Sequence, residues 1–173
     1  SNRKVSDYIR ILSALGKEKS HEGTGKVKNV QLRPYSGGPK GINSKKELGD
    51  LIRAIELGLG VSRLAITYDK LNELHDEGMK TLKLAIQQVR SIDNFELDVS
   101  FCRNVTETGM EYVLEGLASK PDLKYLSYFS FAGSTFSDAA FSMFPQTMGN
   151  FKGLEQLNLR FLDCDNLTNK AIE

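Results

Sequence analysis

The stretch Leu123-Lys124-Tyr125-Leu126-Ser127-Tyr128 decides the fold, because its apolar first, fourth and sixth positions return along the chain. The same pattern lies 31 residues earlier at 92–97, 31 residues later at 154–159, and again at 61–66. A further copy starts at Val27, 34 residues before Val61. Apolar residues two positions apart are typical of a short strand with one face turned inward. The pattern therefore predicts one strand in each copy.

Apolar residues also recur between the predicted strands, at spacings of three and four that are typical of a helix with one buried face. Each such segment is preceded by a residue that can begin a helix: Ser44, Thr106, Ser137 or Thr168, with the weaker His75 in one copy. Repeated strand, turn and helix predict an α/β fold with a parallel sheet on one side and helices on the other. The apolar columns are Leu74, Val105, Phe136 and Leu167; Met79, Met110, Phe141 and Ile172; Leu82, Val113 and Phe144; and Ile86, Leu117 and Met148.

Two copies carry a cysteine shortly after the strand, in the patterns Leu97-x-Val99-x-x-Cys102 and Leu159-x-Phe161-x-x-Cys164. With the apolar columns, these patterns make residues 27–173 resemble leucine-rich repeats of the ribonuclease-inhibitor-like type, including cysteine-containing repeats found in many F-box substrate receptors. The resemblance implies a right-handed α/β horseshoe solenoid of about five 31-residue repeats, the last incomplete at Glu173. The sheet would line the concave side and the helices the outside. It also implies a protein-binding scaffold or adaptor that is not an enzyme.

Strand alternation assigns the third, fifth and seventh positions of each copy to the concave face, where a partner protein would bind. Aromatic residues there, with acids on one neighbouring strand and arginine on the other, have the composition of a binding hot spot. An alternative is that a local bulge at 128–131 turns Phe129 toward the core. The predicted partner-binding residues are Arg63, Glu96, Asp98, Tyr125, Phe129, Asn158 and Arg160.

Charge is unevenly distributed along the chain of 173 residues, although its net charge is only +1. Residues 1–46 hold eleven Lys and Arg against three Asp and Glu. Residues 1–26 are predicted to form an amphipathic helix and a basic polar linker, with the helix serving as a cap over the first strand or as a docking helix. The basic segment suggests an alternative role, attachment to an anionic surface or a nucleic acid, although a protein partner is favoured.

A second alternative is a regulatory role such as GTPase activation, which similar repeats perform in one family. Such a role needs an exposed residue on a repeat edge that assists hydrolysis in trans. Arg103 and Asn104 are the candidates for it.

The two cysteines, Cys102 and Cys164, show no C-x-x-C or Cys/His spacing, so no metal and no cofactor are expected. They would lie on strands two steps apart, about 10 Å, which exceeds the limit of about 7 Å for a disulfide. Both are therefore expected to be reduced. No run approaches the roughly 18 apolar residues of a membrane span, and no secretory signal opens the sequence, which favours a cytoplasmic location.

Overall fold

The computed structural model describes residues 27–32, 58–68, 74–131, 136–138, 147–164 and 166–168, without the side chains of Val27, Lys28, Phe129 and Phe131. The predicted helix and linker of residues 1–26 lie outside the described residues. So do the predicted first helix, most of the fourth, and the segment after Thr168.

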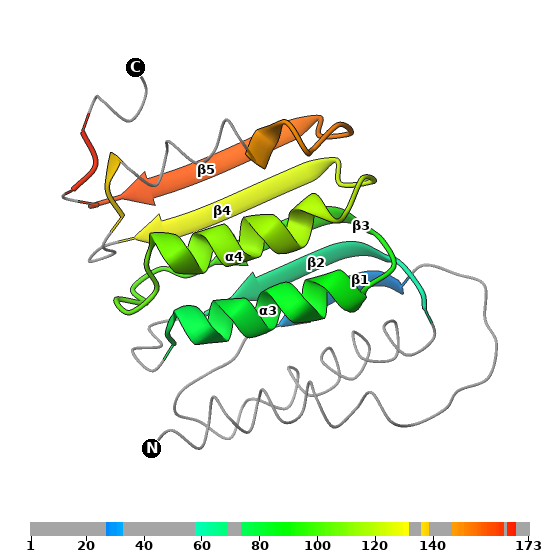
Figure 1. The fold of residues 1–173 in the computed structure, drawn as a ribbon, viewed down its shortest axis with the longest axis horizontal. Coiled ribbons are helices and arrows are strands. Elements are labelled where there is room, and N and C mark those ends of the chain that lie inside the picture. Colours follow the sequence, from blue (N-terminus) through cyan, green and yellow to red (C-terminus); the bar gives the residue numbers. More distant parts are fainter. Residues whose placement is uncertain are drawn as a thin grey trace.

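In the described part of the chain, five parallel strands form one sheet in chain order, β1 to β5 (Figure 1). Leu64 pairs with Phe95, Phe95 with Leu126, and Leu126 with Leu157, so the register follows the 31-residue spacing of the sequence. The prediction of an α/β fold with a parallel sheet is confirmed. The strands are β1 (Val27–Leu32), β2 (Val61–Thr67), β3 (Ile92–Asp98), β4 (Tyr125–Phe131) and β5 (Gln156–Leu162).

Two helices connect the middle strands, α3 (Asp76–Gln88) and α4 (Glu107–Ala118). They lie side by side on the same face of the sheet (Figure 1). At the start of α4 the Thr106 hydroxyl accepts a hydrogen bond from the Thr108 N–H at 3.2 Å, as the sequence predicts. His75, in the same position before α3, makes no side-chain cap.

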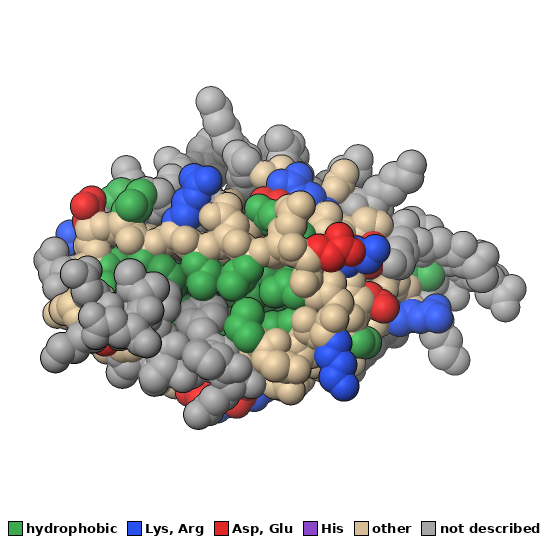
Figure 2. Space-filling view, turned by 90° about the horizontal axis from the view of Figure 1, so that it is seen from above, with side chains coloured by type: hydrophobic (Ala, Val, Ile, Leu, Met, Phe, Trp, Pro, Cys, Tyr) green, Lys and Arg blue, Asp and Glu red, His purple; other side chains and the backbone are tan. Residues whose placement is uncertain are grey.

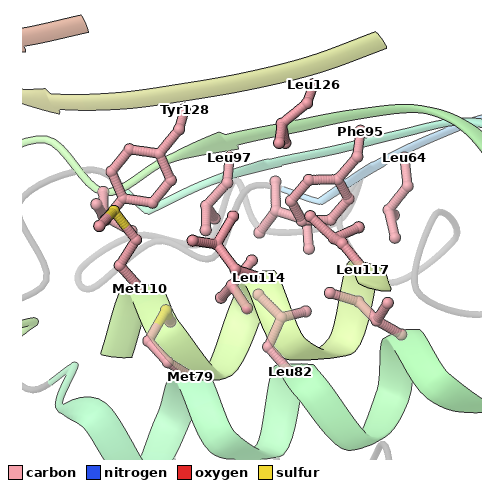
Figure 3. Packing of buried hydrophobic residues seen from close by; sticks show 14 of the residues in the cluster. Leu64, Met79, Leu82, Phe95, Leu97, Met110, Leu114, Leu117, Leu126 and Tyr128 are labelled. Atoms are coloured by element: carbon pink, nitrogen blue, oxygen red, sulfur yellow. The ribbon is translucent and has the colours of Figure 1, made fainter. Parts of the chain in front are cut away.

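The core fills the space between this face of the sheet and the two helices (Figure 3). The predicted apolar columns lie in it: Leu74, Val105 and Phe136 are each at most 2% exposed. Residues from every layer interdigitate, so the strands and helices bury one another's apolar faces. The labelled side chains are Leu64, Phe95, Leu97, Leu126 and Tyr128 from the strands, Met79 and Leu82 from α3, and Met110, Leu114 and Leu117 from α4.

Carboxylates at helix starts bind the cap residue of the following copy, and we call these contacts the helix-start bridges. Asp76 accepts hydrogen bonds from the Thr106 N–H at 2.8 Å and from its hydroxyl at 2.6 Å. Asp138 binds Thr168 in the same way, at 2.7 and 2.6 Å. Glu107 binds the N–H and hydroxyl of Ser137. The cap residues were predicted, but their binding to an acid 30 residues earlier was not.

Two glycines of α4 permit the close approach of α3. A Cβ atom at Gly109 would lie 2.4 Å from Asp76 Oδ1, and one at Gly116 would lie 3.1 Å from the Cα of Lys83. The distance at Gly109 is shorter than real Cβ contacts, so any larger residue there must displace the carboxylate of Asp76 and with it the helix-start bridge to Thr106. Gly109 and Gly116 therefore have a packing role between α3 and α4.

The carboxyl end of α3 is capped by a lysine from the loop after α4. Lys120 is 4% exposed, and its Nζ donates to the carbonyl oxygens of Gln87 at 3.2 Å and Val89 at 2.5 Å. Burial lowers the pKa of Lys120 below its ordinary value. The ammonium group satisfies carbonyls that a helix end leaves without intrahelical partners.

Strand β4 buries three hydroxyl groups that have no hydrogen-bond partner among the described residues, on Ser127, Tyr128 and Ser130. The Tyr128 ring packs edge-on against Phe136 and stacks on Phe161, with ring centroids 6.0 and 5.7 Å away. Burial raises the pKa of the Tyr128 phenol well above its ordinary value of 10.0. The ring is well accommodated, whereas its hydroxyl is a cost to stability.

Replacing Tyr128 by phenylalanine should raise the free energy of unfolding by about 1 to 2 kcal/mol at neutral pH, because it removes a buried unpaired hydroxyl. The gain should grow above about pH 10, where the unfolded chain of the parent ionises this phenol and the folded chain does not. The parent protein keeps its full stability below the pKa of the phenol in the unfolded chain, and it loses stability as the pH rises above that value. Urea titrations of both proteins at pH 7 and pH 10.5 measure the effect; a destabilised Tyr128→Phe at neutral pH contradicts it.

Candidate functional site

The sheet face turned away from α3 and α4 carries a grid of mostly polar side chains, which we call the ladder face. Its residues alternate with the core residues along each strand. Neighbouring strands place them in rows across the sheet. The described members are Asn29 and Gln31 of β1, Arg63, Ala65 and Thr67 of β2, Asn94, Glu96 and Asp98 of β3, Tyr125 and Ser127 of β4, and Gln156, Asn158, Arg160 and Leu162 of β5.

Arg63 and Glu96 form a two-pronged ion pair across β2 and β3. The Nε and Nη2 atoms of Arg63 donate to the two carboxylate oxygens of Glu96, each at 2.8 Å. The hydrogen bond to Glu96 raises the pKa of Arg63 above its ordinary value. Because the side chains are 45% and 27% exposed, the pair contributes at most about 1 kcal/mol to stability. Its main effect is to hold two charged groups in one orientation.

Tyr125 lies in the same register row as Arg63, with Asn94 of β3 between them. Its backbone lies in register between Asn94 of β3 and Gln156 of β5. The phenol is half-buried, and β4, which carries it, pairs directly with the strand of Glu96. We call Arg63, Glu96 and Tyr125 together the Tyr125 cluster.

Small residues occupy the middle row next to the cluster. Ser127 lies in register between Glu96 and Asn158 and is 0% exposed, and Ala65 on the other side of Glu96 is 5% exposed. The middle row therefore offers a partner the side chains of Glu96 and Asn158, with a buried serine between them. The sequence placed Ala65 and Ser127 on this face but did not reveal that they are buried.

Asp98 is engaged in a turn at the end of β3. Its Oδ1 accepts a hydrogen bond from the Ser100 N–H at 2.9 Å and a second one from the Ser100 hydroxyl. Glu96 and Asp98, both predicted to bind a partner, therefore already accept hydrogen bonds within the chain, because each has a donor in a neighbouring strand or turn.

The backbone of β4 passes through Phe129 without a bulge. Phe129 lies in register between Asp98 and Arg160, and the pairing with β5 continues to Phe131 and Leu162 without a shift. A bulge at 128–131 is therefore excluded for the backbone, while the Phe129 side chain lies outside the described residues. On the next strand Arg160 Nε donates to Asn158 Oδ1 at 3.4 Å.

The cysteine turns after β3 and β5 have the same geometry. The Cys102 thiol donates to the carbonyl oxygens of Tyr68 and Ser100, and the Cys164 thiol to that of Leu162. The residue before each cysteine has a positive φ, 61° at Phe101 and 55° at Asp163. Neither cysteine is in a disulfide, as their spacing predicts.

Arg103 and Asn104 lie exposed in the turn between β3 and α4, away from the Tyr125 cluster. Among the described residues, no group of three or more His, Cys, Asp or Glu side chains could hold a metal ion. None of the helices in the described ranges combines the length and apolar character that crossing a membrane requires.

No protein-family model, no curated protein and no solved structure matches this chain. Its function is therefore inferred from the chemistry of its own surface.

Proposed function

We propose that the chain is a leucine-rich-repeat protein of the ribonuclease-inhibitor-like type that binds another protein through the ladder face. The observation that supports this most is the Tyr125 cluster, in which the arginine of an ion pair fixed at two 2.8 Å hydrogen bonds shares a register row with a half-buried tyrosine. Tyrosine and arginine are enriched in binding hot spots, and a side chain held in place loses little entropy on binding. The strands in chain order and the 31-residue register are consistent with a solenoid.

A scaffold or adaptor role fits these groups better than catalysis. Both acids of the ladder face already accept hydrogen bonds. Glu96 binds the guanidinium of Arg63, which is always protonated, and Asp98 binds the N–H and hydroxyl of Ser100 in a turn. A general acid or base needs a proton-transfer site directed at the substrate. Cysteines outside disulfides, as Cys102 and Cys164 are, suit the reducing cytoplasm.

The size of the ladder face limits the expected affinity. Five strands at about 4.8 Å and about 15 to 20 Å of strand height give a footprint of a few hundred Å². Standard interfaces cover about 800 Å² on each partner. We therefore expect dissociation constants in the micromolar range for a partner that contacts this face alone.

Site-specific photo-crosslinking tests which face binds. A benzophenone amino acid in place of Tyr125 should form adducts with a partner in extracts of the source cells. The same substitution at Tyr112, which lies on α4 with Lys80 and Lys83 near its ring, is the matched control. Adducts from position 112 with none from position 125 would refute the ladder face as the binding surface.

With a partner identified, Tyr125→Ala should raise its dissociation constant roughly 30-fold, which corresponds to a hot spot of about 2 kcal/mol. Arg63→Ala should weaken binding as well, because it also releases Glu96. Isothermal titration calorimetry measures both variants beside Tyr112→Ala. Equal affinity of all three would leave the Tyr125 cluster without a role in binding.

A further inference from the structure

The first row of the ladder face alternates two kinds of side chain from strand to strand. Its members in register are Asn29 of β1, Arg63 of β2, Asn94 of β3, Tyr125 of β4 and Gln156 of β5. Strands β1, β3 and β5 therefore each carry an amide, whereas β2 and β4 carry a flat guanidinium or phenol group. We call these five residues the amide row.

The amides of this row have hydrogen-bonding capacity to spare. Asn29 and Gln156 are exposed and Asn94 is partly exposed, and none of these side chains makes a hydrogen bond to another described residue. Each amide carries two N–H donors and one acceptor oxygen. Arg63 uses its Nε and Nη2 donors on Glu96, which holds the guanidinium in place. The row therefore offers donors at every second strand to a ligand with free carbonyl groups.

The charges of the ladder face are balanced, so they are complementary to a neutral ligand. Its described members include the basic Arg63 and Arg160 and the acidic Glu96 and Asp98, and Arg63 is paired with Glu96. Figure 2 shows the molecule from the side of β5, where acidic and basic side chains are interspersed among the described residues without a large patch of one sign. A strongly charged ligand would find no matching field here.

The spacing of the amides matches a polyproline II helix. Neighbouring strands lie about 4.8 Å apart, so amides on every second strand recur at about 9.6 Å. A polyproline II helix has about three residues per turn and rises about 3.1 Å per residue, which gives about 9.3 Å per turn. Two turns of an α-helix span about 10.8 Å, and a β-strand repeats its side-chain direction at about 6.6 Å. Between β1 and β5 the mismatch is about 0.6 Å for polyproline II and about 2.4 Å for an α-helix.

The main chain of a polyproline II helix also suits the chemistry of the row. It has no internal hydrogen bonds, so its carbonyl groups are free to accept from the amide donors. In an α-helix these carbonyls are already bound within the helix. Proline has no N–H, so a proline-rich segment presents acceptors and apolar rings. The rings would pack on Tyr125, because aromatic side chains line the surfaces on which proline-rich segments bind.

On the basis of the function proposed above, we propose that the partner of the ladder face presents a neutral, proline-rich segment in the polyproline II conformation. The segment lies across the strands along the amide row. One turn of it meets each amide, and about six residues reach from Asn29 to Gln156. Because a polyproline II helix is preformed, the segment loses little conformational entropy on binding, which offsets part of the disadvantage of a small footprint.

Nonaproline with an acetylated amino end and an amidated carboxyl end is the probe, because it is neutral and forms a polyproline II helix. In NMR spectra that correlate ¹H and ¹⁵N, it should saturably shift the side-chain NH₂ signals of Asn29, Asn94 and Gln156. The NH₂ signal of Asn150, which is exposed in the segment before β5, should stay in place. Triproline, which makes a single turn, and a flexible Gly-Ser peptide of nine residues should each bind roughly tenfold or more weakly.

The substitution Asn94→Asp separates donor chemistry from shape. A carboxylate has nearly the size of the amide but only accepts hydrogen bonds, so nonaproline should bind roughly fivefold or more weakly. Asn150→Asp is the matched control and should bind as the parent does, and Gln156→Glu repeats the test at a second amide. Unchanged binding to both ladder-face variants, no saturable shift with nonaproline, or tighter binding of an alanine-rich helical peptide would overturn the proposal.

Crosslinking distinguishes a failure of this proposal from a failure of the proposed function. Excess nonaproline should suppress the adducts that a benzophenone at position 125 forms with a partner. Adducts at position 125 that persist in excess nonaproline, and that mass spectrometry traces to a helical segment of the partner, would overturn the proline-rich ligand. That result would leave binding through the ladder face standing.

Discussion

Truncating Leu126 to alanine should lower the free energy of unfolding by about 2 to 5 kcal/mol, because it empties a fully packed position in the core. The same truncation one copy later, at Leu157, should cost less than about 1 kcal/mol. The two side chains are chemically identical and occupy the same row of the sheet, at 1% and 44% exposure. Among the described strands, β4 has a neighbour on both sides, whereas β5 has one only on the side of β4.

Urea denaturation followed by circular dichroism measures both costs, and the exposure of Leu157 makes its variant the internal reference. Equal costs at the two positions would show that β5 is covered in solution.

Replacing Gly109 by valine should cost about 3 kcal/mol or more. The new Cβ would lie 2.4 Å from Asp76 Oδ1 and 3.0 Å from the Met79 side chain, so α3 and α4 must separate and the bridge to Thr106 must break. Overpacking costs about 1 to 3 kcal/mol, and unpaired polar groups at Thr106 add about 1 to 3 kcal/mol. Thr108→Val, at the exposed neighbouring position, is the control for a valine in this turn of α4. Intrinsic helix propensity does not account for the cost at Gly109, because glycine is a poorer helix former than valine.

A double-mutant cycle separates the two causes. In the Asp76→Ala background the bridge is already absent and the atom that clashes has been removed, so Gly109→Val should cost at least 1 kcal/mol less than in the parent. Additive costs would show that the strain arises at Met79 and Val105 alone. Both measurements use equilibrium unfolding.

The sheet and its core could be predicted from the sequence because they depend on a period. If consecutive strands are neighbours in the sheet, apolar residues at a constant spacing lie opposite one another on adjacent strands. Phe95, Leu126 and Leu157 are paired in this way. The cap at Thr106 could be predicted equally well, because capping depends on local sequence.

The contacts of the candidate site were harder to predict. Arg63 and Glu96 are 33 residues apart, so they meet diagonally across two strands and not within one register row. Asp98 was assigned to the correct face, but the donor that occupies it, Ser100, lies in a turn with no repeating pattern. The exposure of Leu157 depends on a neighbour that alternation along β5 does not reveal.

The contacts at the two ends of α3 also bear on how the chain matures during synthesis. The first residue of this helix, Asp76, is bridged to Thr106, and its last carbonyls are capped by Lys120, residues that follow them by 30 to 33 positions. A ribosome adds about 5 to 20 residues per second, so a newly made α3 waits a few seconds for both stabilising contacts. During that interval water must satisfy the Asp76 carboxylate and the carbonyl groups of Gln87 and Val89, so both ends of α3 are completed only after the following copy has been made.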